Sequence, residues 1–432
     1  MSGLWGTASR SPRWAERVAL ALVAVFAFSA TYKVSWANSA LGLLLIAAVV
    51  MRDGLLRYLV HTLAGRITLA YLGYIGIYAA VSATLSGTLA PFAATAPYVQ
   101  GGLLSILVLA FWFERLPSAA AWTIALLPLG LLARVLARWQ AEDGWALLAG
   151  SARASFGDSA VNFALWALIG ALCAILAAYR VSQQPSWSRP VRLGAGGALL
   201  VLAAVTLAGV FLSQTRAVWL LAIVLLPVLV VALLRAGTAN RCRWPALVVA
   251  ILGLASVLIG ATLVLGEGML ERWRGEHDAL VSALVGEWQD VDTETSVGQR
   301  LHIYQVGIEA VSERPWLGQG PGTDAAVLAA SGDAVVAHYG VEHLHNSALV
   351  MWVEYGMPGL AFFAAFFLVP AWYARRALRA GEREGYAVLS LVVLIAMFGA
   401  SMSNHVLGGY RAPFVLALFA GLAVARGWRA RY

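Results

Sequence analysis

The feature that most constrains this chain is a succession of apolar runs separated by short polar breaks. A transmembrane helix needs roughly 17 to 25 predominantly apolar residues, about the length of most of these runs. Twelve can be drawn, of which the first two are short: 16–31, 36–51, 67–84, 98–113, 118–134, 160–179, 193–212, 217–234, 245–266, 346–374, 386–402 and 412–426. The sequence therefore predicts an all-α fold, a polytopic membrane helical bundle of about twelve transmembrane helices.

Composition supports this prediction and excludes other classes. Hydrophobic residues make up 61% of the 432 residues and charged residues only 12%, too few for the surface of a soluble fold of this length. The net charge of +8 comes almost entirely from arginines scattered between the apolar runs, whereas a nucleic-acid-binding protein gathers such charges on one face. The only two cysteines, Cys173 and Cys242, indicate no disulfide framework.

The distribution of basic residues predicts the orientation in the membrane. Twenty of the thirty Lys and Arg residues fall in the N-terminal segment, in alternate loops and in the C-terminal tail. An even number of spans places both termini on the same side of the membrane. By the positive-inside rule this side is the cytoplasm. The first apolar run lacks a small-residue cleavage site before the next span, so we expect a retained helix and not a removed signal peptide. The chain is thus predicted to be a multi-pass membrane protein.

One long loop interrupts the succession of spans and divides the chain into three parts. Nine helices are expected in residues 1–266, the loop in 267–345 and three further helices in 346–432. The loop carries thirteen of the twenty-two acidic residues and, by the predicted topology, lies outside the cytoplasm. Loops of this length do not follow the charge rule, so its acidity does not contradict the orientation. Because so long a connection is usually functional, we expect it to carry the active-site elements.

A helix is predicted inside this loop. Ser296 followed by Gln299 is typical of a capping box, which predicts a helix from about Val297 to Ser312 that ends before Arg314-Pro315. Four residues at helical spacing would form its apolar face and place it against the membrane surface: Leu301, Tyr304, Ile308 and Val311.

Histidines gather on the predicted extracytoplasmic side. Six of the seven lie there: His277, His302, His338, His343, His345 and His405. His343-Leu344-His345-Asn346 stands where the loop re-enters the membrane, and histidine is suited to act as a general base near neutral pH. Two alternatives remain open at this point. His345 and Asn346 could only cap the tenth span, or His338, His343 and His345 could hold a metal ion with Glu342, although their spacing fits no standard zinc pattern.

Two arginines on the extracytoplasmic side are candidates for binding phosphate. Arg216 ends the turn Ser213-Gln214-Thr215-Arg216 between two apolar helices, where the alternative is an interfacial arginine that extends toward water. Arg300 lies on the same helical stripe as Tyr304. A guanidinium group binds phosphate with two parallel hydrogen bonds.

Two glycine-containing segments complete the pattern. Gly318-Gln319-Gly320-Pro321-Gly322 could present backbone N–H groups to phosphate or form a plain turn. Gly356-Met357-Pro358-Gly359 is predicted to break the tenth span. Glu354 precedes that break, and an ionisable residue at such depth is functional or paired, with a partner that the sequence does not name.

These motifs together resemble the O-antigen ligase and O-antigen polymerase superfamily. His345-Asn346 is followed after nine residues by Gly356 and after two more by Gly359, which is similar to the family's pattern. The turn ending at Arg216, the Arg300 helix that runs into Pro315-Trp316-Leu317-Gly318, and a long loop between the ninth and tenth of twelve spans also match. The resemblance covers about residues 205–365 by motif and the whole chain by topology.

The resemblance implies an O-antigen ligase, an inverting and metal-independent glycosyltransferase. Such an enzyme moves O-antigen polysaccharide from undecaprenyl diphosphate to lipid A–core at the periplasmic face, without a cofactor and without nucleic acid. The family's histidine maps onto His345 as the general base and its two arginines map onto Arg216 and Arg300 as diphosphate ligands. His343, Asn346 and Tyr304 are expected to support them. Alternatives are an O-antigen polymerase or a protein O-oligosaccharyltransferase of the same superfamily.

A secondary transporter is the alternative from a different class. Transporters of this size carry ionisable residues near the bilayer midplane and contain paired internal repeats. Only Glu354 approaches the first condition, and no repeat is visible in the sequence.

Overall fold

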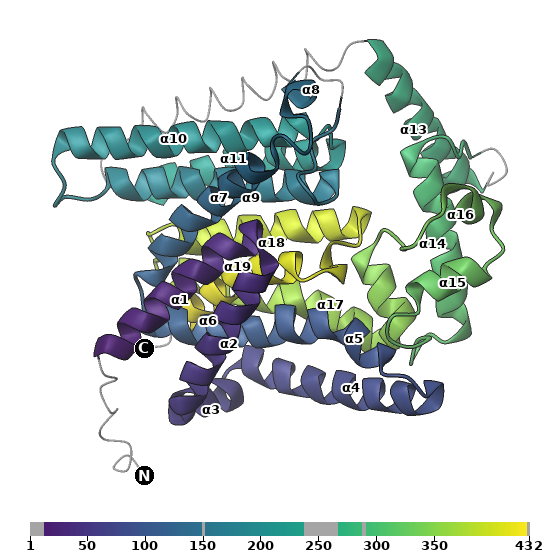
Figure 1. Ribbon diagram of the computed structural model, residues 1–432, viewed down its shortest axis with the longest axis horizontal. Helices are drawn as coiled ribbons and strands as arrows, with labels where there is room; N and C mark the ends of the chain where they lie inside the picture. The colour runs from purple at the N-terminus through teal and green to yellow at the C-terminus, as the bar shows by residue number, and fades with distance from the viewer. Residues whose placement is uncertain (1–12, 149–151, 237–266, 287–290, 430–432) are drawn as a thin grey trace.

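The computed structural model describes residues 13–148, 152–236, 267–286 and 291–429 (Figure 1). Every regular element in these ranges is a helix, which confirms the all-α prediction. The principal helices are α1 (Arg13–Tyr32), α2 (Val34–Val50), α3 (Arg52–His61), α4 (Leu63–Ser86), α5 (Ala90–Ala96), η1 (Pro97–Leu104), α6 (Ser105–Arg115), α7 (Ala119–Arg138), α8 (Gly144–Leu148), α9 (Ala160–Ser182), α10 (Arg189–Leu212), α11 (Arg216–Ala236), α13 (Glu267–Val285), α14 (Ser296–Glu313), α15 (Asp324–Ala330), α16 (Ala334–Tyr339), α17 (Ser347–Arg379), α18 (Tyr386–Ser403), η3 (Val406–Gly408) and α19 (Arg411–Arg429).

Among the described residues, ten helical segments are long and apolar enough to cross a membrane, and each coincides with a predicted span. The predicted span 36–51 corresponds to α2, which has 17 residues and stands at the short limit. The predicted span 245–266 lies outside the described residues. The fourth span begins earlier than predicted, because α5, η1 and α6 run on as one segment, Ala90–Arg115. The chain is a polytopic helical membrane protein.

The core of the bundle surrounds α19, nearly all of whose residues are buried. It packs against α6, α17, α18 and α1, while α9 fills the second half of the bundle between α10 and α7. Close approach depends on small residues: a Cβ at Gly427 would lie 2.3 Å from the Tyr373 carbonyl oxygen. Small residues allow helix backbones to approach in a membrane, where lipid supplies little hydrophobic driving force for association.

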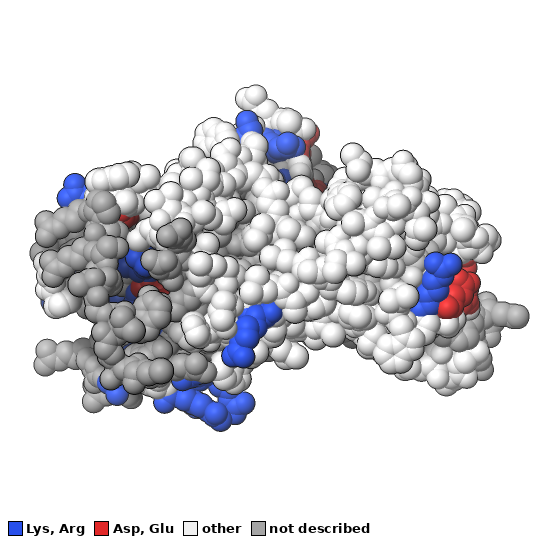
Figure 2. Space-filling model, turned by 90° about the horizontal axis from the view of Figure 1, so that it is seen from below, with Lys and Arg blue, Asp and Glu red and all other residues white. Residues whose placement is uncertain are grey.

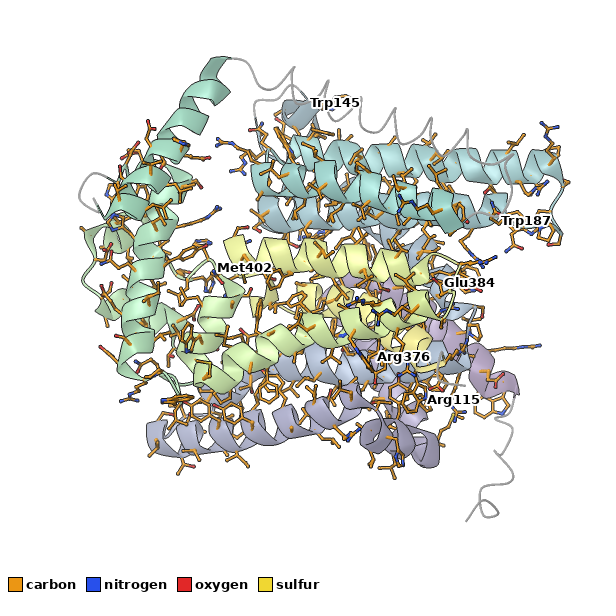
Figure 3. All side chains as sticks on the ribbon, turned by 180° about the vertical axis from the view of Figure 1, so that it is seen from behind. Arg115, Trp145, Trp187, Arg376, Glu384 and Met402 are labelled. Atoms are coloured by element: carbon orange, nitrogen blue, oxygen red, sulfur yellow. The ribbon has the colours of Figure 1, made fainter. Side chains whose placement is uncertain are left out.

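The connections between spans gather at two opposite ends of the bundle. Helices α13 to α16 stand at one end, and the beginning of α1 and the end of α19 lie at the other (Figure 1). Arg115, Arg376 and Glu384 mark this second end, whereas Met402 lies toward the loop helices (Figure 3). On the face seen in Figure 2, charged side chains form only small separate groups on an otherwise uncharged surface, as lipid contact requires.

Helix α14 differs from its prediction in both its cap and its buried face. Its N-cap is Thr295, one residue before the predicted Ser296, and the Thr295 side chain accepts from the Gly298 N–H. Of the predicted apolar stripe, Val311 is buried and Ile308 is 59% exposed, and the residues of α14 that are buried in the protein are Gly298, Ile303, Val306, Gly307, Ala310 and Val311. This face packs against α17. Gly307 is the contact point, since a Cβ there would lie 2.6 Å from the Leu349 side chain.

Candidate active site

The candidate site is built around the first turn of α17. Asn346 is the N-cap, and its Oδ1 accepts from the backbone N–H groups of Ala348 (3.0 Å) and Leu349 (3.1 Å). Asn346 therefore caps this helix, as one of the two alternatives expected. His345 has a φ of +49°, a left-handed conformation that is uncommon for a residue with a side chain. Strained backbone of this kind gathers at functional sites, where the surroundings hold it in place.

The His345 ring is held in an orientation that suits a base. Its Nδ1 lies 3.3 Å from the side-chain oxygen of Asn404, which follows α18. An amide oxygen only accepts, so this bond requires a proton on Nδ1 and leaves the lone pair on Nε2. Burial lowers the pKa of His345, and the positive charge of Arg300 lowers it further against the opposing bond to Asn404. The shift favours the neutral imidazole, which is the form that can accept a proton.

Tyr304 connects the loop helix α14 with the residue before α17 and with the end of α18. Its hydroxyl lies 3.2 Å from the carbonyl oxygen of His345 and 3.1 Å from that of Met402, at the end of α18. Ser347 reinforces the same junction, since its hydroxyl donates to the Asn404 carbonyl oxygen at 3.3 Å. The backbone on each side of the His345–Asn404 bond is thus fixed from α14 and α17.

Arg300 lies one helical turn before Tyr304 and is close enough to act on the site electrostatically. Its positive charge lowers the pKa of both His345 and Tyr304, although burial leaves the pKa of Tyr304 raised overall. In the described parts of the chain, the half-buried Arg300 side chain makes no ion pair and no hydrogen bond. A guanidinium group without a protein partner beside a neutral imidazole is available to bind an anion.

Arg216 is the first residue of α11 and is paired with a carboxylate. The predicted tight turn is confirmed, since α10 ends at Leu212 and α11 begins at Arg216. The Nη1 of Arg216 lies 2.7 Å from the Glu276 carboxylate of α13. The same atom is buried without an aligned hydrogen bond, so the contact is electrostatic attraction without hydrogen-bond geometry. The positive end of the α11 dipole adds to the attraction for an anion.

Backbone contacts fix the turn before Arg216. Gln214 has a φ of +52°, and the Ala154 N–H donates to the Leu212 carbonyl oxygen at 2.9 Å. Arg153 donates from Nε to the Ser213 carbonyl oxygen at 3.2 Å. The segment that precedes α9 therefore holds this hairpin end.

The structure brings together four of the six predicted site residues. His345, Asn346, Tyr304 and Arg300 meet where α14 packs on α17. Arg216 stands on the neighbouring junction, tied to α13, which itself packs against α14. His343 turns to a different group, described below.

The predicted break in α17 is confirmed, and it explains the glycine-rich segment. Gly356 has φ 66° and ψ −160°, and the proline at 358 lacks the N–H that the Glu354 carbonyl oxygen would otherwise accept. Backbone N–H groups of the loop replace the lost partners. Gln319 donates to Val353 O at 2.6 Å and Gly320 donates to Glu354 O at 3.1 Å. These two N–H groups are therefore engaged by the helix and not open to phosphate.

The same loop supplies the partner of Glu354 that the sequence did not name. Glu354 is buried, and its carboxylate accepts a hydrogen bond from the backbone N–H of Gly322. Its other oxygen, Oε2, has no partner among the described residues. Glu354 thus secures the glycine-rich loop against the broken helix.

A group of polar residues beside His345 was not predicted. His343 Nδ1 lies 3.3 Å from Asp324 Oδ2, His405 Nδ1 lies 3.9 Å from the same oxygen, and Tyr98 reaches His405 Nε2 at 3.3 Å. The alternative of a metal ion held by His338, His343 and His345 with Glu342 does not agree with this arrangement. The ring of His338 packs edge-on against Tyr339, and that of His345 turns to Asn404. The polar pair Asn404-His405 directly after a predicted span was the signal in the sequence that pointed to this side of the site.

Comparison with protein families finds a match to the part of the chain that contains much of this site. Residues 198–364 match the family model described as O-antigen ligase. The match runs from within α10 through the break in α17, and so includes Arg216, Arg300, His345 and Gly356. A search of curated protein sequences finds no match. Over residues 198–364, the part of the chain that holds these four residues, the sequence is therefore similar to the O-antigen ligase family.

Proposed function

We propose that the protein is an O-antigen ligase that moves O-antigen polysaccharide from undecaprenyl diphosphate to lipid A–core. The observation that carries the proposal is the His345 group. A neutral imidazole is held through Nδ1 by Asn404 while Arg300, without a protein partner in the described chain, lies beside it. A base next to an anion-binding group is what attack on a diphosphate-linked sugar needs.

In the proposed step, Nε2 of His345 removes the proton from the acceptor hydroxyl. The hydroxyl oxygen attacks the anomeric carbon from the face opposite the diphosphate, and the electron pair of the breaking C–O bond leaves with the diphosphate. A single displacement inverts the configuration at that carbon. Arg300 and Arg216 stabilise the charge that develops on the leaving group. No nucleotide takes part and the step itself needs no metal ion, because the leaving group is already activated as a diphosphate.

The ion pair between Arg216 and Glu276 bears on how the donor enters. At 2.7 Å without hydrogen-bond alignment, the carboxylate balances the arginine's charge but leaves Nη1 without a hydrogen bond among the described residues. A diphosphate offers oxygens that guanidinium donors bind with two parallel hydrogen bonds. We propose that the donor displaces Glu276 from Arg216 and that Glu276 keeps this arginine balanced when no donor is bound.

The arginine distribution supports an arrangement in which the α13–α16 end faces the periplasm and both termini face the cytoplasm of a bacterial inner membrane. The lipid-linked donor and the lipid A–core acceptor would then meet the site from the outer leaflet. In this arrangement the segment 267–345 supplies catalytic elements between the transmembrane parts 1–266 and 346–432.

The test is transfer by His345→Ala in proteoliposomes supplied with lipid-linked O-antigen and lipid A–core. Losing a positioned general base should slow transfer by about 10²–10⁴-fold. His338→Ala is the matched control, because this exposed histidine of α16 packs against the Tyr339 ring, away from His345, and should retain full activity. Transfer by His345→Ala at the rate of the control would exclude His345 as the base.

The acceptor distinguishes the ligase from its relatives. The wild-type protein is given the same donor with lipid A–core, with a second lipid-linked repeat, or with a pilin. Product with lipid A–core supports the ligase. Product only with the second repeat would make the protein a polymerase, and product only with pilin an O-oligosaccharyltransferase. Movement of donor across the membrane without any transfer product would instead favour a transporter.

A further inference from the structure

Three potential metal ligands from three separate segments meet beside the site. Asp324 is the first residue of α15, His343 precedes α17, and His405 lies between α18 and η3. Each offers one ligand atom, and these atoms all lie within 4.8 Å of one another. The proposed transfer step uses none of the three.

We propose that Asp324, His343 and His405 bind a divalent transition-metal ion of the zinc class. Imidazole nitrogen and carboxylate oxygen are both zinc ligands, and sites with two histidines, one carboxylate and an open fourth position are well known. The proposal stands apart from the proposed transfer reaction, because it assigns the ion no part in the chemical step.

The spacing of the ligand atoms supports a metal ion more than a hydrogen-bonded triad. Ligands about 2.0–2.2 Å from zinc at tetrahedral angles lie roughly 3.3 Å from one another. Asp324 Oδ2 and His343 Nδ1 are 3.3 Å apart. Asp324 Oδ2 and His405 Nδ1 are 3.9 Å apart, too long for a hydrogen bond but within a small movement of the distance that a shared ion sets.

Further hydrogen bonds orient these ligands. His405 is turned by Tyr98, whose hydroxyl lies 3.3 Å from His405 Nε2 and leaves Nδ1 directed to Asp324. Asp324 is buried, and its carboxylate accepts the backbone N–H of Ala325. Metal-ligating histidines and carboxylates usually have such outer partners, which fix the tautomer and the direction of the ligand atom.

The location gives the ion a defined consequence. It would join α15 and the segment before α17 to the connection between α18 and α19, which also carries Asn404. The periplasmic loop would then be fixed to the bundle on both sides of the His345–Asn404 bond. The ion would therefore stabilise the fold around the site, and metal binding would be measurable without any assay of transfer.

The experiment uses the full-length protein purified in detergent with a tag that contains no histidine. The protein is treated with chelator, dialysed and titrated with Co²⁺, whose visible absorption reports a site with nitrogen and oxygen ligands. In a separate sample, zinc content is measured by elemental analysis. We expect one ion per chain and a higher melting temperature with zinc, since an ion that binds only the folded state stabilises it. His343→Gln, whose side chain is exposed, should abolish the cobalt spectrum and the shift.

The matched control is the pair His302 and Asp333, whose side chains lie 3.6 Å apart and belong to no group of three potential ligands among the described residues. His302→Gln should bind metal as the wild type does. Tyr98→Phe retains all three ligands and removes only the outer partner of His405, so it should weaken metal binding by roughly 10- to 100-fold. Absence of stoichiometric metal in the wild type, or equal metal binding by wild type and His343→Gln, would overturn the proposal.

Discussion

The two ends of the bundle use polar groups in different ways. At the α13–α16 end, the polar contacts around His345 are at least partly buried and join segments far apart in sequence, as in Tyr304 with Met402 and His345 with Asn404. At the opposite end the charges are more exposed. Glu384 pairs with Arg426 at 2.9 Å and with Arg180 at 4.0 Å, and 43% of its side chain is accessible. The first end determines a geometry, whereas the second mainly marks the limit of the membrane.

This difference indicates at which end a substitution should have the larger effect on stability and activity. Buried polar networks are strengthened by their low-dielectric surroundings and are costly when one member is lost. Exposed ion pairs are screened by water and salt and contribute little. Equivalent substitutions at the two ends should therefore differ in effect.

The largest effect on folding is expected for Gly356→Ala at the site end. A Cβ there would lie 2.2 Å from the Trp316 carbonyl oxygen, and the φ of 66° with ψ −160° is a conformation almost confined to glycine. Strain and overpacking together should lower the free energy of unfolding by roughly 2 to 6 kcal/mol. Thermal unfolding in detergent measures it.

Gly73→Ala in α4 is the control, since a Cβ there meets nothing within 4 Å. A melting temperature for Gly356→Ala that matches this control would show that the break in α17 is not held by the loop.

Substitution of either arginine of the site should lower the rate of transfer without unfolding the protein. Arg300→Gln and Arg216→Gln are each expected to reduce transfer by about 10²–10³-fold, the effect of losing one electrostatic group at a developing charge. Glu276→Gln should act in the opposite sense on the donor and lower its KM, because Arg216 is then no longer paired. Initial rates at varied donor concentration separate the two effects. An unchanged rate with Arg300→Gln would remove this arginine from the site.

A moderate effect is expected at Asp158, where the segment before α9 meets α19. Its carboxylate lies 2.6 Å from Arg411 and 3.3 Å from Arg134. Burial raises the pKa of Asp158, but the two guanidinium groups and the Trp166 and Asn162 donors outweigh it and hold the pKa below its ordinary value of 3.8. Asp158→Asn should cost about 1.5–3 kcal/mol of stability near pH 7.

The pH dependence of this effect has a definite sign. A carboxyl whose pKa is depressed by folding stabilises the protein fully above its unfolded pKa and loses that contribution as the pH falls through the folded value. The difference in melting temperature between wild type and Asp158→Asn should stay constant from pH 7 to about pH 5 and shrink below about pH 4. A difference that grew toward acid pH would contradict the assignment of the ion pairs.

The smallest effect is expected at the opposite end, for Glu384→Gln. Its two ion pairs with Arg426 and Arg180 are partly exposed, so their loss should change the free energy of unfolding by less than about 1 kcal/mol. The same thermal assay, repeated at high salt, checks it. A cost as large as that of Asp158→Asn would remove the distinction between the two ends.

The sequence predicted what depends on local pattern. The apolar runs predicted ten spans that the structure contains, because crossing a membrane demands a minimum length of apolar helix. The break at Gly356 followed from glycine and proline inside a span. Asn404 as the partner of His345 could not be predicted, since 59 residues separate them and only the packing of α18 beside α17 joins them.

The face of α14 that packs against α17 could not be predicted for a related reason. Tyr304 and Ile308 have the spacing of a single stripe, yet Tyr304 turns to the site and Ile308 stays exposed. The buried side is instead determined by Gly307, which admits the Leu349 side chain. A glycine counts as neither polar nor apolar in a periodic pattern, so the contact that orients the helix leaves no periodic signal.

The docking of the glycine-rich loop into the break of α17 has a consequence for how such a site can vary among proteins. Its main hydrogen bonds run from main-chain donors at Gln319 and Gly320 to main-chain acceptors at Val353 and Glu354. Bonds of this type tolerate exchange of the side chains at their own positions. The contact cannot accommodate added side-chain volume at Gly318 or Gly356, because each of these glycines lies against the backbone of the other segment. Relatives that retain this contact should therefore keep glycines at these positions even where the rest of their sequences differ.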